Sequence, residues 1–306
     1  MKKALFLIIL TLNLLGKDLY LWHIKDIRDY ISKHYLNTLT NIDNYLSNDY
    51  TTHNDQIYKN RLYMITSLQI NKNQIKPSLY LHSNLHLPKT QKKLYLVFDK
   101  YSDEIRYKDQ TYENQNDKNS KQDTKFNIGL KYFFIKKDNK NLYTQFGIKL
   151  HSPLKFYFKL GGDKELNFNT WTLNLENNFY YYLTKDGFIP SLLLSIKKPI
   201  NSNLTFKNYY ELLYKSDTNL LSFISSVRVY HNIDKRQMLI YEFYFNALAN
   251  QNCTFCSNLY SINTTYTNKL KPWLYIDLIP KLDFYKDSSF NPSFAFIINF
   301  RTIFSK

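Results

Sequence analysis

The sequence predicts an all-β fold, an antiparallel transmembrane β-barrel of about 14 strands with a short N-terminal helical segment ahead of it. Three observations support this fold class. Apolar and polar residues alternate along most of the chain, as they do in strands with one apolar and one polar face. Aromatic residues make up 17% of the chain, although its mean hydropathy is -0.46. After the first residues, no stretch reaches the roughly 18 uninterrupted apolar residues that a membrane-spanning helix needs.

Residues 1–16 have the composition of a secretory signal peptide. Met1, Lys2 and Lys3 form a charged start, and an apolar run from Ala4 to Leu15 follows. Because this run is too short to span a membrane, we expect cleavage after Gly16 and export of the remainder. No cysteine lies in the region, so a lipoprotein anchor is not indicated.

Residues 17–58 are expected to form a periplasmic amphipathic helix followed by a polar linker. Apolar residues recur every three or four positions from Leu19 to Leu46, and charged residues such as Lys25 and Lys33 fill the other side. Polar residues from Asn48 onward predict the linker. Three roles for the helix stay open: packing against the rest of the chain, oligomerisation, or plugging a pore.

Residues 59–306 are expected to form the barrel, because the period of the apolar pattern changes to two. The last strand, Ser293 to Phe304, carries Phe294, Phe296, Ile298, Phe300 and Phe304 on one face. Two long polar stretches predict loops: Tyr101 to Thr124 after the third strand, and Asn250 to Asn258 after the eleventh. Since both strand numbers are odd, both loops would lie outside the cell if the chain enters the barrel from the periplasm.

The aromatic Phe304 near the end of the last strand resembles the closing signal of Gram-negative outer-membrane β-barrel proteins, although Ser305 and Lys306 follow it. The resemblance extends over residues 59–304 as a pattern of alternation. The segment Leu87 to Leu94 is also similar to a turn of uncharacterised proteobacterial outer-membrane proteins. The resemblance implies a porin-like protein of the bacterial outer membrane, in contact with its lipid and lipopolysaccharide and inserted by the barrel-assembly machinery. It transfers no functional residues.

The net charge of +16 is the main electrostatic feature of the chain, and many of the basic residues fall on the polar faces of the predicted strands. If the apolar face meets lipid, a pore wall with this excess would favour anions. The alternative is that bases pair with acids such as Glu176, Glu211, Glu242, Asp277 and Asp283 inside a filled lumen. No nucleic-acid-binding motif accompanies the charge. The candidate pore-lining residues are Lys125, Lys131, Lys149, Lys155, Lys159, Lys207, Lys215, Arg228, Lys281 and Arg301.

Cys253 and Cys256 are the two cysteines of the chain. In an oxidising compartment, a local disulfide that stiffens a predicted loop is favoured over a redox site, which would open a helix beside a βαβ unit. Two cysteines alone do not complete a zinc site. We therefore predict a disulfide, no metal and no cofactor.

The function predicted from these features is passive passage of small solutes, with some preference for anions. The alternative is a closed structural or interaction barrel, and homo-oligomerisation stays open in either case. A lipid-modifying enzyme is the third candidate, and it would need a serine and a histidine within hydrogen-bonding distance. His82, His86 and the pair His151-Ser152 do not resemble the outer-membrane phospholipase motif, so no catalytic residue is predicted.

Overall fold

The computed structural model describes residues 18–47, 60–72, 74–87, 94–99, 126–150, 154–183, 187–250 and 253–305. These ranges contain one long helix, fourteen strands and one turn of 3-10 helix. The elements are α2 (Asp18–Ser47), β1 (Leu62–Asn71), β2 (Gln74–His86), β3 (Leu94–Asp99), β4 (Phe126–Lys137), β5 (Lys140–Leu150), β6 (Lys155–Asn167), β7 (Thr172–Tyr182), β8 (Phe188–Pro199), β9 (Leu204–Lys215), β10 (Leu220–Asn232), β11 (Gln237–Asn250), β12 (Cys253–Lys271), β13 (Leu274–Tyr285), η3 (Lys286–Ser288) and β14 (Pro292–Phe304).

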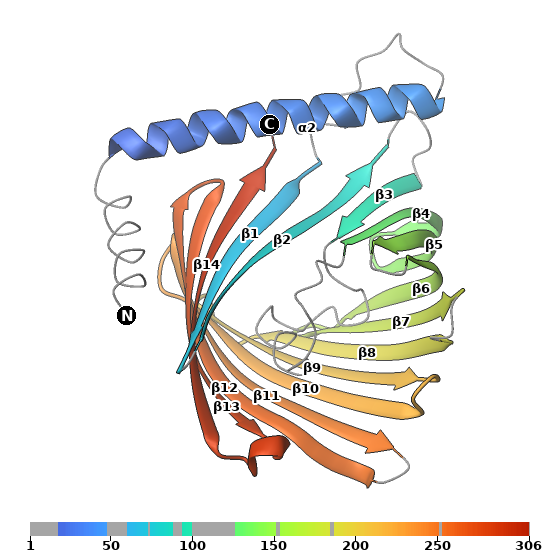
Figure 1. The fold of residues 1–306 in the computed structure, drawn as a ribbon, viewed down its shortest axis with the longest axis vertical. Coiled ribbons are helices and arrows are strands. Elements are labelled where there is room, and N and C mark those ends of the chain that lie inside the picture. The colour runs from blue at the N-terminus through green and yellow to red at the C-terminus, as the bar shows by residue number, and fades with distance from the viewer. Residues whose placement is uncertain are drawn as a thin grey trace.

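The strands close into a barrel in which each strand pairs antiparallel with its neighbours in sequence. The first and last strands complete the circle, with Ser67 of β1 opposite Asn299 of β14 on one side and opposite Ser78 of β2 on the other. Figure 1 shows the strands winding around a common interior. Closure leaves no unpaired strand edge, which a membrane-embedded sheet requires. The predicted fold class is confirmed.

Side chains alternate between the two faces of the wall, as the period of two requires. On β5, Leu142, Phe146 and Leu150 are exposed on the outside, whereas Tyr143 and Gln145 are buried on the inside. Outward positions on the other strands are mostly apolar and exposed as well, and inward positions are largely polar or aromatic. An apolar exterior around a polar interior is the arrangement that lipid imposes on a spanning barrel.

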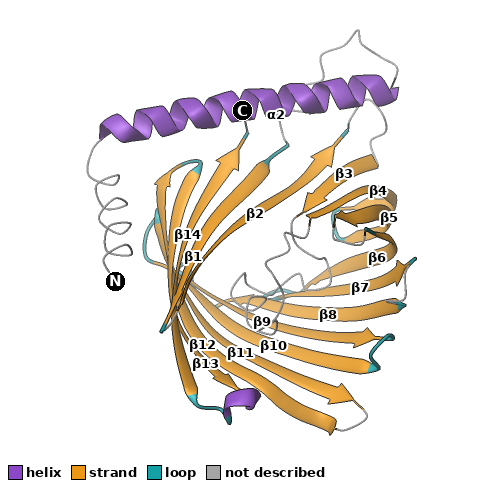
Figure 2. Ribbon diagram, in the orientation of Figure 1, coloured by secondary structure: helices purple, strands orange, loops and turns teal. Residues whose placement is uncertain are grey.

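The strand connections differ between the two ends of the barrel. At the end that also holds the C-terminus, the connections from β4 to β5 and from β12 to β13 have two residues each, and those after β6, β8 and β10 have four. These short turns are drawn in teal in Figure 2 where they are described. The predicted long loop after the third strand and the predicted signal peptide both lie outside the described residues.

The helix α2 lies across the barrel end that holds the C-terminus (Figure 1). It begins and ends within one residue of the predicted helix. The Arg28 guanidinium donates to the backbone oxygens of Ile303 and Ser305, at 3.3 and 2.7 Å. These contacts fit the first of the three predicted roles, packing against the barrel. Among the described residues, no helix combines the length and the apolar character needed to cross a membrane.

The prediction of a loop around the cysteines is wrong. Cys253 begins β12, which is 19 residues long and continues to Lys271. The pairing of β12 with β11 is irregular there, because the register shifts between Leu248 and Asn250. Polar residues and a bulge give this strand end the composition of a loop, which is why the alternation was not visible in the sequence.

Candidate functional site

The candidate site is the inward wall of the barrel. Each described candidate lies an even number of residues from a buried inward side chain on its own strand, as Lys149 does from Gln145 and Arg228 from Ser226. Lys125 lies outside the described residues. Their role in lining a pore stays a prediction. The inward candidates are Lys131, Lys149, Lys155, Lys159, Lys207, Lys215, Arg228, Lys281 and Arg301.

One sector of the wall combines lysines with tyrosines. The ammonium of Lys131 lies 3.6 Å from the ring centroid of Tyr143, and that of Lys159 lies 4.7 Å from the ring centroid of Tyr180. Ring faces attract cations without cancelling their charge. The rings therefore hold the ammonium groups in place along the wall. We call this sector the lysine–tyrosine wall; it consists of Lys131, Lys149, Lys155 and Lys159 with Tyr143, Tyr157, Tyr180 and Tyr182 from β4 to β7.

Glycine makes room for the tyrosine rings of this wall. A Cβ atom on Gly147 would lie 2.6 Å from the ring of Tyr157, and one on Gly161 would lie 2.4 Å from the ring of Tyr143. Both glycines face inward, so the rings lie flat against the backbone. The chain has only 6 glycines, and their use at these two positions indicates that the flat ring orientation is specific.

Like charges lie directly opposite each other at two places on the inward face. Lys149 of β5 pairs with Lys155 of β6. Lys207 of β9 lies between Lys197 of β8 and Arg228 of β10. Directly opposed side chains on neighbouring strands have Cβ atoms about 4.5–5.5 Å apart, and like charges at this spacing repel. We call Lys197, Lys207 and Arg228 the basic row.

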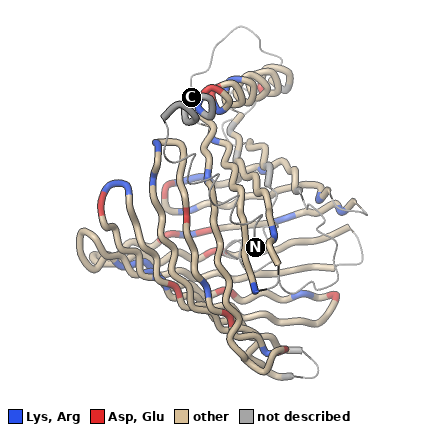
Figure 3. The backbone as a smooth tube through the Cα atoms, turned by 60° about the vertical axis from the view of Figure 1, so that its left-hand side comes forward, with Lys and Arg blue, Asp and Glu red and all other residues tan. Residues whose placement is uncertain are grey.

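The sector from β10 to β14 is balanced by ion pairs instead. The Arg228 guanidinium lies 2.7 Å from Glu242, and the Lys281 ammonium lies 2.8 Å from Asp283, with both side chains of the second pair at most 1% exposed. Arg301 and Asp277 form a third pair at 2.7 Å. Figure 3 shows basic and acidic positions along the strands. These three ion pairs all lie between β10 and β14.

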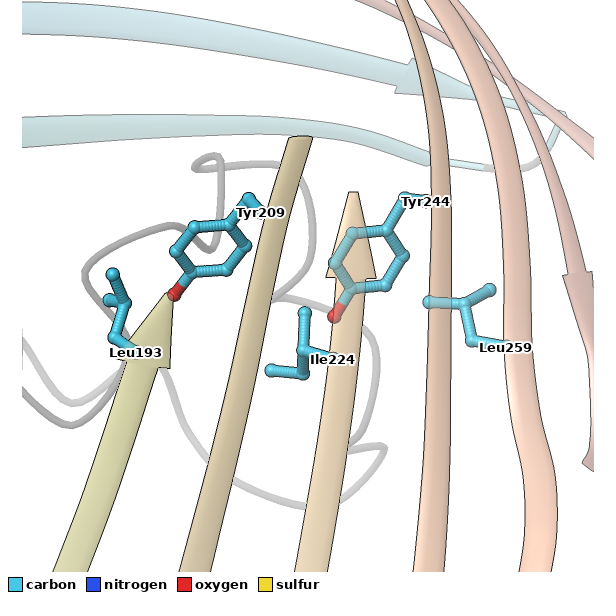
Figure 4. Close-up of a cluster of buried hydrophobic side chains, with 5 residues drawn as sticks. All are labelled: Leu193, Tyr209, Ile224, Tyr244 and Leu259. Atoms are coloured by element: carbon cyan, nitrogen blue, oxygen red, sulfur yellow. The ribbon is translucent and has the colours of Figure 1, made fainter. Parts of the chain in front are cut away.

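An apolar cluster interrupts the polar interior. Its side chains come from five successive strands, β8 to β12, and lie in a row along the inward face (Figure 4). The hydroxyl of Tyr209 in this cluster donates to the buried carboxylate of Glu211. The partly buried Tyr285 packs against the row. The residues of this apolar row are Leu193, Tyr209, Ile224, Tyr244 and Leu259.

Sequence reasoning missed several inward bases. Lys136 follows a register shift between Phe133 and Ile135, which reverses the alternation and turns Lys136 inward over the ring of Tyr95. Lys197 and Lys269 lie near strand ends, where few alternating residues remain to define a face. Lys197 can be recognised as inward because it pairs directly with the inward Lys207.

The histidines and cysteines considered in the sequence analysis form neither a catalytic arrangement nor a metal site among the described residues. His82 faces inward, 6.3 Å from the ring of Tyr63, while His151 and Ser152 lie outside the described residues. Within the described ranges, no group of three His, Cys, Asp or Glu side chains could hold a metal ion. Cys256 is not a free thiol, and its bond to Cys253 stays a prediction.

No protein-family model and no curated protein matches the sequence. Solved structures do match. OmpT, an outer membrane protein of Vibrio cholerae, has a TM-score of 0.48 and 9% identity, covering 79% of this chain and 96% of that chain. The CymD monoaromatic hydrocarbon channel has a TM-score of 0.46 and 8% identity, covering 81% of this chain and 88% of that chain. The NanC porin has a TM-score of 0.41 and 7% identity, covering 80% of this chain and 99% of that chain.

At these identities the likeness is one of fold, and no function is transferred from it. The physical observations stand without it: fourteen antiparallel strands close into a barrel, its exterior is apolar and exposed, and its interior is polar. The chain therefore folds as a closed antiparallel β-barrel with the exterior of a membrane-spanning barrel.

Proposed function

We propose that the barrel is a passive channel for small solutes and that it prefers anions. The observation that carries the proposal is the placement of basic side chains directly opposite each other on the inward wall, Lys149 with Lys155 and Lys197 with Lys207. Basic side chains on the wall of a lumen raise the local concentration of anions there.

The size of the barrel is compatible with an open lumen. Barrels of about 8 strands are filled by their own side chains, whereas those of about 16–18 strands leave an aqueous channel. This barrel, with 14 strands, lies near the upper group. The flat tyrosine rings over Gly147 and Gly161 support the same conclusion, because rings lying along the wall leave more of the lumen free than rings that project into it.

A second candidate, the closed structural or interaction barrel, has its own support. The three ion pairs between β10 and β14 and the apolar row bury side chains that an open channel would leave in water. In the channel proposal, the same apolar row is a poorly hydrated section of the wall. Conductance separates the two candidates, because a closed barrel carries no ion current.

The test is charge reversal on the inward face with a matched reversal on the outward face. The inward variant carries Lys149→Glu and Lys155→Glu. The control carries Lys140→Glu and Lys164→Glu, which also oppose each other on β5 and β6 but are exposed on the outward side near the strand ends. Both variants change the total charge equally, so only position differs.

The expected size of the effect follows from Coulomb's law. A unit charge about 10 Å from an ion in water contributes about 0.4 kcal/mol, and screening at about 0.1 M salt reduces this to about one third. Reversing both inward lysines changes the wall by four units of charge. The ratio of anion to cation permeability should therefore fall about eightfold, and that of the control should change little. An unchanged ratio in the inward variant would contradict the proposed selectivity.

A further inference from the structure

The helix α2 packs on the outside of the barrel wall, at its rim. The hydroxyls of Tyr35 and Ser83 lie 2.9 Å apart, and Leu36 and Leu39 form a buried cluster with Leu85. Ser83 and Leu85 lie on the same face of β2 as Ile75 and Leu79, which are exposed on the lipid side. Leu96, which packs against the same cluster, lies directly opposite Leu85 on β3.

The last residues of β14 and Ser305 hold α2 at the rim of the barrel. The Arg28 guanidinium holds the backbone oxygens of Ile303 and Ser305, and it lies 5.9 Å from the ring centroid of Trp273 in the turn before β13. Both sites belong to the rim of the barrel. A helix of 30 residues is about 45 Å long, so α2 extends well beyond the strands that it contacts.

The apolar arc of α2 is wider than its contact with the barrel. At 100° per residue, Ile27 and Tyr45 point in the same direction, with Ile31 and Ile42 close to it. This direction lies about 120° from that of the barrel contact at Leu39. Ile27 and Tyr45 are 59% and 77% exposed.

The polar arc of the same helix points elsewhere. Asp26, Lys33, Asn37 and Asn41 lie on the opposite side from the barrel contact and are exposed. By the same rotation, Tyr30 points between Asn37 and Asn41, and it is 65% exposed. The helix therefore has three sides: one on the barrel, one polar, and a third on which the exposed His34 and Thr38 lie beside Ile27 and Tyr45, with no covering protein among the described residues.

We propose that this third side lies in the membrane that holds the barrel, and that α2 is an interfacial helix whose partner is phospholipid. The proposal rests on the outer face of β2, which continues from the lipid-covered part of the wall to the contact with α2. Ser83 and Leu85 belong to the same outer face as the exposed Ile75 and Leu79, and lipid covers that face. A helix resting on it at the rim meets the headgroup layer. Isoleucine and tyrosine suit the boundary between headgroups and acyl chains.

The first test measures where each side of α2 lies. Single cysteines replace Ile27 and Tyr45, and, as matched controls, Asn37 and Asn41, in a background carrying Cys253→Ser and Cys256→Ser. Each protein is folded into vesicles of phosphatidylethanolamine and phosphatidylglycerol and spin-labelled. Accessibility to oxygen relative to a water-soluble nickel chelate should be severalfold higher at 27 and 45 than at 37 and 41. Equal accessibility would overturn the proposal, and so would spin–spin broadening at 27 or 45, which would indicate a second copy of the chain on this side.

A second test leaves the cysteines unchanged. The double variant Ile27→Asp with Tyr45→Asp is compared with Asn37→Asp with Asn41→Asp, which adds the same charge to the polar arc. In the same vesicles, the first variant should raise the rate of protease cleavage within residues 18–47, because charged side chains leave the lipid boundary. The second should cleave as the unmodified protein does. Equal cleavage of the two variants would contradict lipid contact.

Discussion

Glu242 is a buried acid that accepts hydrogen bonds from both neighbouring strands, β10 and β12. One carboxylate oxygen accepts hydrogen bonds from Ser226 and from the Arg228 guanidinium, at 2.8 Å for Nε, and the other accepts from the Asn263 amide at 3.1 Å. The Glu242 side chain is 2% exposed and that of Arg228 is 12% exposed. Replacing Glu242 with Gln would leave a nearly buried guanidinium without its counter-charge.

Breaking a buried ion pair from one side costs about 3–5 kcal/mol. The lower end applies to Glu242→Gln, because the amide still offers one acceptor oxygen, so we expect a loss of about 3 kcal/mol in the free energy of unfolding. Urea unfolding of the barrel in lipid vesicles, followed by intrinsic fluorescence, measures this loss. Asp287→Asn is the control, since Asp287 is exposed in η3. A loss no larger than that of the control would refute the role given to this pair.

Three further predictions concern the tyrosine rings and the helix. Gly161→Ala should destabilise the barrel by about 2 kcal/mol in the same urea assay, because the ring of Tyr143 must move, whereas Gly162→Ala, whose Cβ would meet its nearest atoms at 3.4 Å, should not. Arg28→Ala should raise the rate of protease cleavage within α2, because the hydrogen bonds from Arg28 to the backbone oxygens of Ile303 and Ser305 are lost. An unchanged rate would contradict a role for these hydrogen bonds in docking the helix. Burial raises the pKa of Tyr35 from its ordinary 10.0 to about 12. The docking energy of α2 should therefore be complete below about pH 10 and fall towards pH 12, and Tyr35→Phe should remove this part of the pH dependence.

The architecture was predictable because lipid imposes a simple rule on every strand. Outward positions near the middle of the wall are mostly apolar, so Phe146 and Phe158 alternate with Gln145 and Lys159 along their strands. The same rule set the faces of the nine described candidate bases, because position on a strand determines the face. Regular alternation therefore predicts both the strands and which of the candidate bases face inward.

The failures share one physical cause, which is local irregularity. Bulges shift the register near Phe133 and near Leu248, so the alternation did not reveal Lys136 as inward, and Cys253 was predicted in a loop. Partners across the sheet were also hidden, because the pairing of Arg228 with Glu242 depends on strand register and not on sequence spacing. The sequence contained both residues, but their ion pair required the folded barrel.

The central claim is that the lumen conducts ions and prefers anions. The most direct measurement folds the unmodified chain into a planar lipid bilayer and records single-channel current under a KCl gradient. The account predicts steady current steps with a reversal potential that favours chloride. A correctly folded barrel that carries no current, or one whose reversal potential favours potassium, would contradict it.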